Sequence, residues 1–273
     1  MTDAGLLAVV KGAGDLATGV ALSFRAAGFR VIMTELAQPT AIRLTVSFAE
    51  AVYAGSQVVE GARAELATME SWPSVLKAGS VAVIVDPGAS ILAGADAAVI
   101  VDAVMAKTNT GTGRKDGAVV IALGPGFTAG RDVDAVIETN RGHELGRIIR
   151  EGSASLDTGT PGEIGGRTSE RVLRAPRDGR VSHHARIGDM VAEGDVVMRV
   201  EGQTVIAPFS GCLRGRISDA VRVRKGMKIG DVDPRGDARF ANVVSDKARA
   251  VGRAALEAAL WIGRERGVLR VLR

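Results

Sequence analysis

The chain has 273 residues, and its 35 Lys and Arg against 31 Asp and Glu give a formal net charge of +4. With 46% apolar residues, this composition excludes a wholly disordered chain and leaves room for one large domain or two ordinary ones. The single cysteine, Cys212, excludes an internal disulfide and a multi-cysteine metal site within one chain, which favours a cytoplasmic protein.

The first 150 residues alternate β-branched runs with Ala-rich stretches, a pattern typical of a parallel sheet with crossover helices. A helix is predicted over residues 16–27, because Gly28 suits the left-handed position that follows a helix. Residues 57–67 fit a strand followed by a turn. The sequence therefore predicts an α/β fold with a Rossmann-like parallel sheet over residues 1–150. The predicted strands are 7–11, 30–34, 81–85, 97–101, 119–123 and 133–137.

Residues 151–170 are polar and rich in Gly, Ser and Thr, and they are predicted to be a linker. Beyond them, residues 171–236 contain an internal repeat with a period of 32, in which residues 175–179 return at 207–211. Two short copies cannot each bury a core, so we expect them to close on each other as a small β-barrel.

The repeat resembles the barrel-sandwich-hybrid fold of biotinyl and lipoyl carriers. The hairpin at residues 200–204 reads Val-Glu-Gly-Gln-Thr and lacks the lysine that carriers modify, so a covalently carried biotin or lipoate is not expected.

Residues 237–273 are predicted to form a C-terminal helix that packs back on a domain. Ser245 would cap this helix, and an apolar stripe would face the domain. A partner-binding helix is the alternative. The stripe contains Ala248, Val251, Ala255, Leu256, Ala259 and Leu260.

The two parts of the chain differ in charge. Residues 1–170 carry 14 Lys and Arg against 19 Asp and Glu, whereas residues 171–273 carry 21 against 12. A basic part can meet an anionic partner, but with 3% aromatic residues there is little to stack on bases, so nucleic acid is not expected. No stretch of about 18 uncharged apolar residues occurs, and the start has no basic region, so neither a membrane span nor export is expected.

The strongest motif is a Gly-x-Gly-x-x-Ala turn between the first strand and the first helix. Gly12 would permit the tight turn, Gly14 would let backbone N–H groups approach a phosphate, and Ala17 would keep helix and strand close. Glu35, at the end of the second strand, stands where an acid binds a ribose hydroxyl. Asp15 would repel a phosphate unless a cation compensates, so a helix-capping role is favoured for it. A turn kept only for packing is the alternative.

Three further polar loops are predicted at the carboxyl edge of the sheet, where ligands bind in open α/β folds. They span residues 107–112, 122–132 and 138–143, and their cations suit phosphate or carboxylate. Ordinary turns are the alternative, and the three histidines suggest no metal set. The candidate ligand-binding residues are Lys107, Gly124, Gly126, Arg131 and Arg141.

Five segments together resemble the YqeB-type family, which is associated with molybdenum hydroxylases, originally the selenium-dependent ones. The glycine motif is also distantly similar to the Rossmann part of XdhC-type accessory proteins, which help to insert sulfurated molybdenum cofactor into xanthine dehydrogenases. The matching segments are residues 11–19, 33–35 with 38–40, 124–130, 138–143 and 228–235.

The resemblance implies an accessory protein for molybdenum hydroxylase maturation, which would bind a nucleotide or the pterin-dinucleotide form of molybdenum cofactor and dock a hydroxylase client. The first alternative is an NAD(P)-dependent oxidoreductase, with His143 as proton donor or acceptor and Glu35 favouring NAD. The second is a non-catalytic adaptor. The sequence leaves open whether a reaction is catalysed and allows a homo-oligomer.

Overall fold

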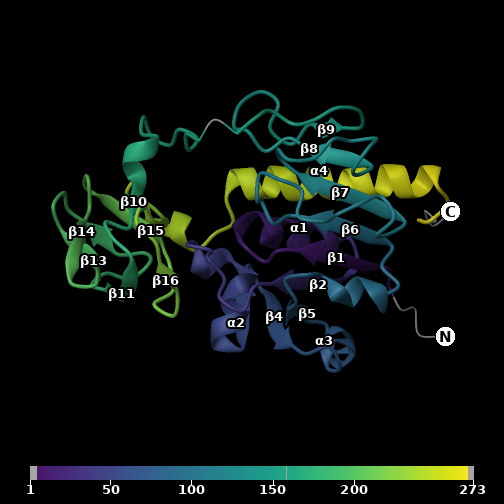
Figure 1. Ribbon diagram of the computed structural model, residues 1–273, viewed down its shortest axis with the longest axis horizontal. Helices are drawn as coiled ribbons and strands as arrows, with labels where there is room; N and C mark the ends of the chain where they lie inside the picture. Colours follow the sequence, from purple (N-terminus) through teal and green to yellow (C-terminus); the bar gives the residue numbers. More distant parts are fainter. Residues whose placement is uncertain (1–4, 158, 270–273) are drawn as a thin grey trace.

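The computed structural model describes residues 5–157 and 159–269, and it sets an α/β unit beside an antiparallel β-sandwich (Figure 1). Among these residues the main sheet has nine strands in the order β3-β4-β5-β2-β1-β6-β7-β8-β9. Strands β4 to β8 run parallel, while β3 and β9 run antiparallel at the two edges. The strands are β1 (Leu7–Lys11), β2 (Arg30–Glu35), β3 (Ser56–Val59), β4 (Ala62–Ala67), β5 (Val81–Val85), β6 (Val99–Asp102), β7 (Val119–Leu123), β8 (Ala135–Ile137) and β9 (Ile148–Ile149).

The predicted α/β class is confirmed, and the sheet is mixed rather than wholly parallel. The six predicted strands are present, although β6 and β8 each begin two residues later than expected. The prediction of a strand and a turn over residues 57–67 was incomplete, because this segment is the hairpin β3–β4. Glu60 and Gly61 make its tight turn, and both have positive φ angles, of 48° and 80°, as such turns require.

The chain crosses from one side of β1 to the other when it passes from β5 to β6. Strands β2 and β5 lie on one side of β1, and β6 and β7 lie on the other. The carboxyl ends of β1 and β6 therefore flank the point where the strand order reverses, which is the position where open α/β sheets bind ligands.

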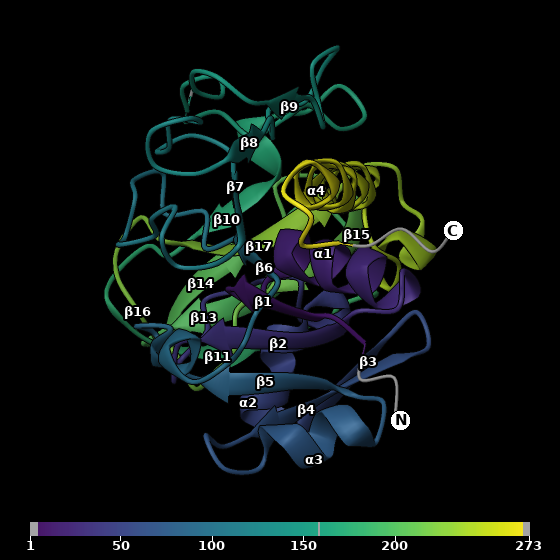
Figure 2. The same ribbon diagram turned by 90° about the vertical axis from the view of Figure 1, so that its right-hand side faces the viewer.

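One face of the sheet is covered by α1 (Asp15–Ala26) and α4 (Asp246–Glu265), which lie side by side in Figure 2. They approach closely at two glycines: a Cβ on Gly19 would lie 2.4 Å from the carbonyl oxygen of Ala248, and a Cβ on Gly252 would lie 2.3 Å from that of Gly19. The predicted C-terminal helix is confirmed, with Ser245 accepting from the Ala248 N–H at 3.1 Å. The short helices are α2 (Ala51–Ala54) and α3 (Trp72–Lys77).

The sandwich consists, within the described residues, of two four-stranded antiparallel sheets, β10-β17-β15-β12 and β14-β13-β11-β16. The 32-residue repeat carries β11, β12 and β13 onto β15, β16 and β17, and each copy contributes strands to both sheets. Neither copy can therefore bury the core alone, as expected. The resemblance to the barrel-sandwich-hybrid fold stays a prediction. The strands are β10 (Val172–Arg174), β11 (Gly179–His183), β12 (Met190–Val191), β13 (Val196–Val200), β14 (Gln203–Ile206), β15 (Gly211–Arg216), β16 (Arg222–Val223) and β17 (Lys228–Asp233).

The two units meet at the segment that follows β2. The Arg216 N–H donates to the carbonyl oxygen of Ile42 at 2.7 Å, and Gly215 allows this approach because a Cβ there would lie 2.9 Å from the same oxygen. Thr45 donates to the carbonyl oxygen of Ala241 at 2.5 Å. These contacts fix the sandwich against the carboxyl edge of the sheet. In the described part of the chain, no helix is both long and apolar enough to cross a membrane.

Candidate anion-binding site

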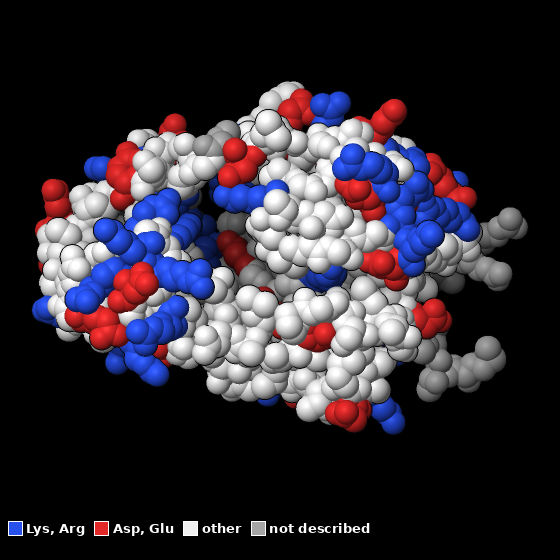
Figure 3. Space-filling view, viewed as in Figure 1, with Lys and Arg blue, Asp and Glu red and all other residues white. Residues whose placement is uncertain are grey.

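A cleft lies between the carboxyl ends of the parallel strands and the sandwich. It consists of two cavities of about 510 and 500 Å³, and the walls of both include Asp15, Arg43, Lys228 and Asp231, so the two are continuous. Figure 3 shows the hollow, with basic side chains gathered along the wall on the sandwich side.

The glycine turn forms one end of the cleft. Gly12 has a φ of +91°, its N–H donates to the Thr34 carbonyl at 2.8 Å, and a Cβ there would lie 3.0 Å from the Ala103 carbonyl oxygen, so only glycine fits. Gly14 begins α1, no described side chain caps the helix, and no described atom lies within 4 Å of the position of a Cβ on Gly14. The N–H groups of the first helical turn are thus accessible from the cleft.

Asp15 does not cap α1, because Gly14 occupies the N-cap position and Asp15 is the first helical residue. Its carboxylate instead pairs with Arg43 at 3.0 Å, while its other oxygen, Oδ1, is buried without a described hydrogen-bond partner. The capping expectation is therefore corrected to an ion pair. Arg43 is the cation that offsets the negative charge beside the turn.

Glu35 holds the turn in place. One carboxylate oxygen accepts from the Ala13 N–H and the other from the Leu36 N–H, both at 2.8 Å. Because each carboxylate oxygen has two lone pairs, Glu35 can still accept from a ribose hydroxyl.

A buried polar cluster lies where the strand order reverses. Lys11 ends β1 and Asp102 ends β6, and the two are paired in register. Lys11 donates to the Thr112 hydroxyl at 2.5 Å, and that hydroxyl donates to Asp102 at 2.5 Å. Lys11 and Asp102 are 3.4 Å apart, and Lys11 lines the first cavity. The cluster holds the Lys11 ammonium at the strand ends, paired with the Asp102 carboxylate.

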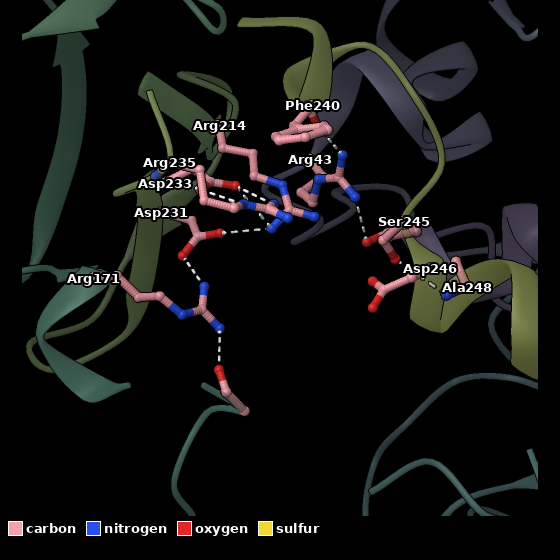
Figure 4. Close-up of polar contacts among 12 residues, drawn as sticks. Arg43, Arg171, Arg214, Asp231, Asp233, Arg235, Phe240, Ser245, Asp246 and Ala248 are labelled. Atoms are coloured by element: carbon pink, nitrogen blue, oxygen red, sulfur yellow. Dashed lines mark hydrogen bonds and ion pairs between the residues drawn. The ribbon is translucent and has the colours of Figure 1, made fainter. Parts of the chain in front are cut away.

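Three arginines, Arg43, Arg171 and Arg214, form what we call the buried arginine cluster (Figure 4). Their side chains are 7%, 8% and 6% exposed, and the Nε atom of each is buried without a described hydrogen-bond partner. Arg43 donates to Asp15 and to the carbonyls of Phe240 and Val243 at 2.9 and 3.0 Å. This is an unusual number of unsatisfied buried donors for one site.

Arg214 is the least satisfied member of the cluster. Its side chain makes no hydrogen bond to a described residue, and its ion pairs with Asp233 and Asp231 are 3.5 and 4.0 Å long. Asp233 instead accepts hydrogen bonds from Arg235 at 2.6 and 2.9 Å. Asp231 forms an ion pair with Arg171. Burial, and then the charge of Arg43, lower the pKa of Arg214, while Asp231, Asp233 and Asp15 act in the opposite direction.

Two lysines add positive charge to the cleft. The loss of bulk water within the cleft lowers the pKa of Lys228, and Arg171 and Arg214 lower it further against the opposing effect of Asp231. Burial likewise lowers the pKa of Lys247, with Arg141 adding to the shift. The second cavity is lined by eight basic side chains and four carboxylates. The cleft is thus suited to an anionic ligand.

Seven of the predicted residues line the cleft. Lys107 pairs with Asp157 at 2.6 Å, and Arg141 pairs with Asp246 at 2.5 Å. The residues are Gly12, Gly14, Asp15, Ala17, Glu35, Lys107 and Arg141.

The other four predicted residues lie outside the cleft lining. A Cβ on Gly124 would lie 2.6 Å from the Thr139 hydroxyl, and one on Gly126 would lie 2.8 Å from the backbone of Lys107, so both allow close loop packing. Arg131 is 74% exposed and pairs with Asp132 at 2.9 Å. His143 is exposed on its loop.

Sequence reasoning did not identify Arg43, Arg171, Arg214, Lys228 or Lys247 as site residues. A signal for two of them was present in the repeat, whose second copy has Arg214 and Lys228 at the positions of Ser182 and Val196 in the first. Among the described residues, no group of three or more His, Cys, Asp or Glu side chains is placed to hold a metal ion.

Comparison with known proteins gives one strong likeness. No family model matches the chain. The chain is 49% identical over 257 residues, 94% of its length, to a protein of Escherichia coli (strain K12) described as uncharacterized protein YqeB. This supports the YqeB-type family indicated by the sequence motifs. The chain spans 48% of that relative, about half of its length.

Two solved structures are weakly similar. The product-bound ectoine utilization protein EutE (DoeB) of Ruegeria pomeroyi is 21% identical with a TM-score of 0.22, over 31% of this chain and 27% of that one. An aspartoacylase family protein of Mesorhizobium loti is 11% identical with a TM-score of 0.27, over 84% and 85% of the two chains. At these TM-scores neither likeness bears on function.

Proposed function

We propose that this chain is an accessory protein in molybdenum hydroxylase maturation. It binds a pyrophosphate-bearing ligand, a nucleotide or the pterin-dinucleotide form of molybdenum cofactor, in the cleft at the carboxyl edge of its sheet. The observation that carries the proposal is the open turn at Gly12 and Gly14, which faces a cleft lined by basic side chains. The link to molybdenum hydroxylases comes from the resemblance to the YqeB-type family.

The residues present fit such a ligand. The N–H groups at the start of α1 would donate to the pyrophosphate, which can approach because Gly14 has no side chain. Arg43 offsets the charge of Asp15, so this carboxylate does not repel the phosphates. Glu35 would accept from a ribose hydroxyl. When bound, the molybdenum cofactor supplies oxidation–reduction chemistry for the client; this chain's residues bind and orient it.

An NAD-dependent oxidoreductase is the second candidate, because Glu35 stands at the end of β2 beside the turn and would meet the charge of an NADP 2′-phosphate. The proton donor predicted for it, His143, does not line the cleft, and this makes it the weaker candidate.

Mass spectrometry of small molecules released on denaturation tests the proposal. The protein is purified from a host that makes molybdenum cofactor. A stoichiometric pterin supports the maturation role, whereas stoichiometric NAD or NADP favours the oxidoreductase. A protein that releases neither, and that shows no saturable binding of either in titration, contradicts both.

Gly14→Asp is the matched variant. Gly14 has ordinary φ and ψ angles of −68° and −171° at an N-cap position, where Asp is favourable, so we expect unchanged or slightly higher stability. The new carboxylate would occupy the phosphate approach, and retention of the ligand should fall by about tenfold or more. Gly94→Asp, at another open position with φ of −121°, is the control and should bind normally. Equal ligand retention in both variants would contradict binding at the turn.

A further inference from the structure

We propose that the cleft contains a second anion site, formed by Arg214, Lys228 and Lys247, that takes a phosphate group, and that the ligand therefore carries anionic groups at two separated points. This inference rests on the proposed function, since it places the second group on the same ligand. The two sites draw on different elements: the glycine turn begins α1, whereas Arg214 and Lys228 belong to the sandwich and Lys247 belongs to α4.

The first argument is the unmet hydrogen-bonding capacity of Arg214. A guanidinium has five N–H donors, and a buried one ordinarily has partners for them. The Arg214 side chain is 6% exposed and makes no hydrogen bond to a described residue. It is also not needed to neutralise Asp233, which Arg235 already matches with two hydrogen bonds. Its donors are therefore available to a ligand.

The second argument is the concentration of like charge. The Lys228 side chain, exposed at the cleft wall, makes no hydrogen bond to a described residue and no ion pair within 4.0 Å, yet it lies close enough to Arg171 and Arg214 for their charges to lower its pKa. Lys228 in turn lowers the pKa of Lys247, across the cleft on α4. Holding these cations together in a cleft opposes folding unless an anion joins them.

The third argument concerns the kind of anion. One Nη atom of Arg43 donates to Asp15, and the other donates to backbone carbonyls that include that of Phe240 (Figure 4). Arg43 therefore contributes charge and holds the wall in place. The available donors are the fork of Arg214 and two ammonium groups. A planar guanidinium flanked by two ammonium groups suits a tetrahedral dianion. A phosphate monoester is the common biological form of such an anion.

The test measures binding of inorganic phosphate by calorimetry, with sodium chloride at matched ionic strength as the blank. We expect saturable binding by the full chain and a loss of about tenfold or more in Lys228→Met and in Arg214→Met. Arg224→Met removes an exposed sandwich arginine that does not line the cleft, and it should bind as the unmodified chain does.

Lys228→Met guards against a folding artefact, because Lys228 has no described partner to lose. Without phosphate, removal of its charge should raise the unfolding temperature at low salt, whereas a structural lysine would lower it. Unchanged phosphate affinity in both cleft variants overturns the proposal, as does a chain that shows no saturable phosphate binding.

Two further measurements distinguish failure of this second site from failure of the proposed function. Gly14→Asp should weaken phosphate binding much less than Lys228→Met does, because Gly14 contributes no donor to the second site. If no nucleotide or pterin binds but phosphate binding still depends on Arg214 and Lys228, the proposed function fails and the second site stands. Competition with AMP shows whether the site takes an organic phosphate or the free phosphate ion. If it takes an organic phosphate, AMP should displace bound inorganic phosphate more strongly than added inorganic phosphate does.

Discussion

At the scale of single residues, His183 combines burial with an unsatisfied ring nitrogen. It ends β11, it is half-buried, and its Nδ1 atom has no described hydrogen-bond partner. Burial, followed by the charge of Arg216, lowers its pKa to about 4, while Asp219 acts in the opposite direction. The folded protein therefore holds His183 neutral at pH values where an unfolded chain protonates it.

This difference predicts a loss of stability in mild acid. Between pH 6.5 and about 4 the unfolded chain binds a proton that the folded chain does not, so stability falls as pH falls through that window. We expect His183 to account for about 2 kcal/mol of the loss, after allowance for partial exposure. Urea unfolding at pH 7 and pH 4.5 should show a smaller loss in His183→Gln. The exposed neighbour offers the control: His184→Gln should behave as the unmodified chain, and equal pH dependence in all three proteins would contradict the prediction.

How far the site could be predicted depends on whether its residues are local in sequence. Gly12, Gly14 and Glu35 were found because a strand, a turn and the end of the next strand impose their spacing. Arg214 and Lys228 come from a separate unit and enter the cleft only because the backbone at Gly215 docks on Ile42, a contact that no local pattern encodes.

At the scale of elements, the contact between α1 and α4 depends on glycine. The sequence predicted α4 and most of its apolar stripe, although Leu260 of that stripe is 43% exposed. Gly252 alone would be read as a residue that weakens a helix. The structure shows why it is there, since the backbone of α1 at Gly19 leaves no room for a side chain.

Two effects of opposite sign compete in Gly252→Ala. Helix propensity favours alanine by about 1 kcal/mol, whereas a Cβ placed 2.3 Å from the Gly19 carbonyl oxygen forces two backbones apart. Because a backbone atom cannot turn away, overpacking should dominate, and we expect a net loss of about 2 kcal/mol in urea unfolding. Glu257→Ala, on the exposed side of α4, should change stability by less than about 0.5 kcal/mol. A more stable Gly252→Ala protein would show that the helices are not in close contact.

At the scale of the whole molecule, the sheet unit and the sandwich are coupled through the segment that contains Ile42 and Arg43. The hydrogen bond from Arg216 to Ile42 and those from Arg43 to the carbonyls before α4 connect three parts of the chain. We therefore expect the two units to unfold in a single calorimetric transition.

Gly215→Val tests this coupling. Valine suits a strand, but its Cβ would lie 2.9 Å from the Ile42 carbonyl oxygen, so the junction must open. We expect the single transition to split in two and phosphate binding in the cleft to weaken. Ser182→Val, at an exposed strand position in the same sandwich, should keep one transition. One transition at an unchanged temperature in Gly215→Val would mean that the junction does not couple the units.

The packing of α4 on α1 has a consequence for biosynthesis. A ribosome delivers β1 to β9 and then the whole sandwich before it releases residues 246–265. Until then, the apolar surface of α1, β7 and β8 that α4 covers stays bare. The sheet can therefore complete its core only after the rest of the chain has emerged. We therefore expect a fragment that stops before α4 to be recovered as aggregate.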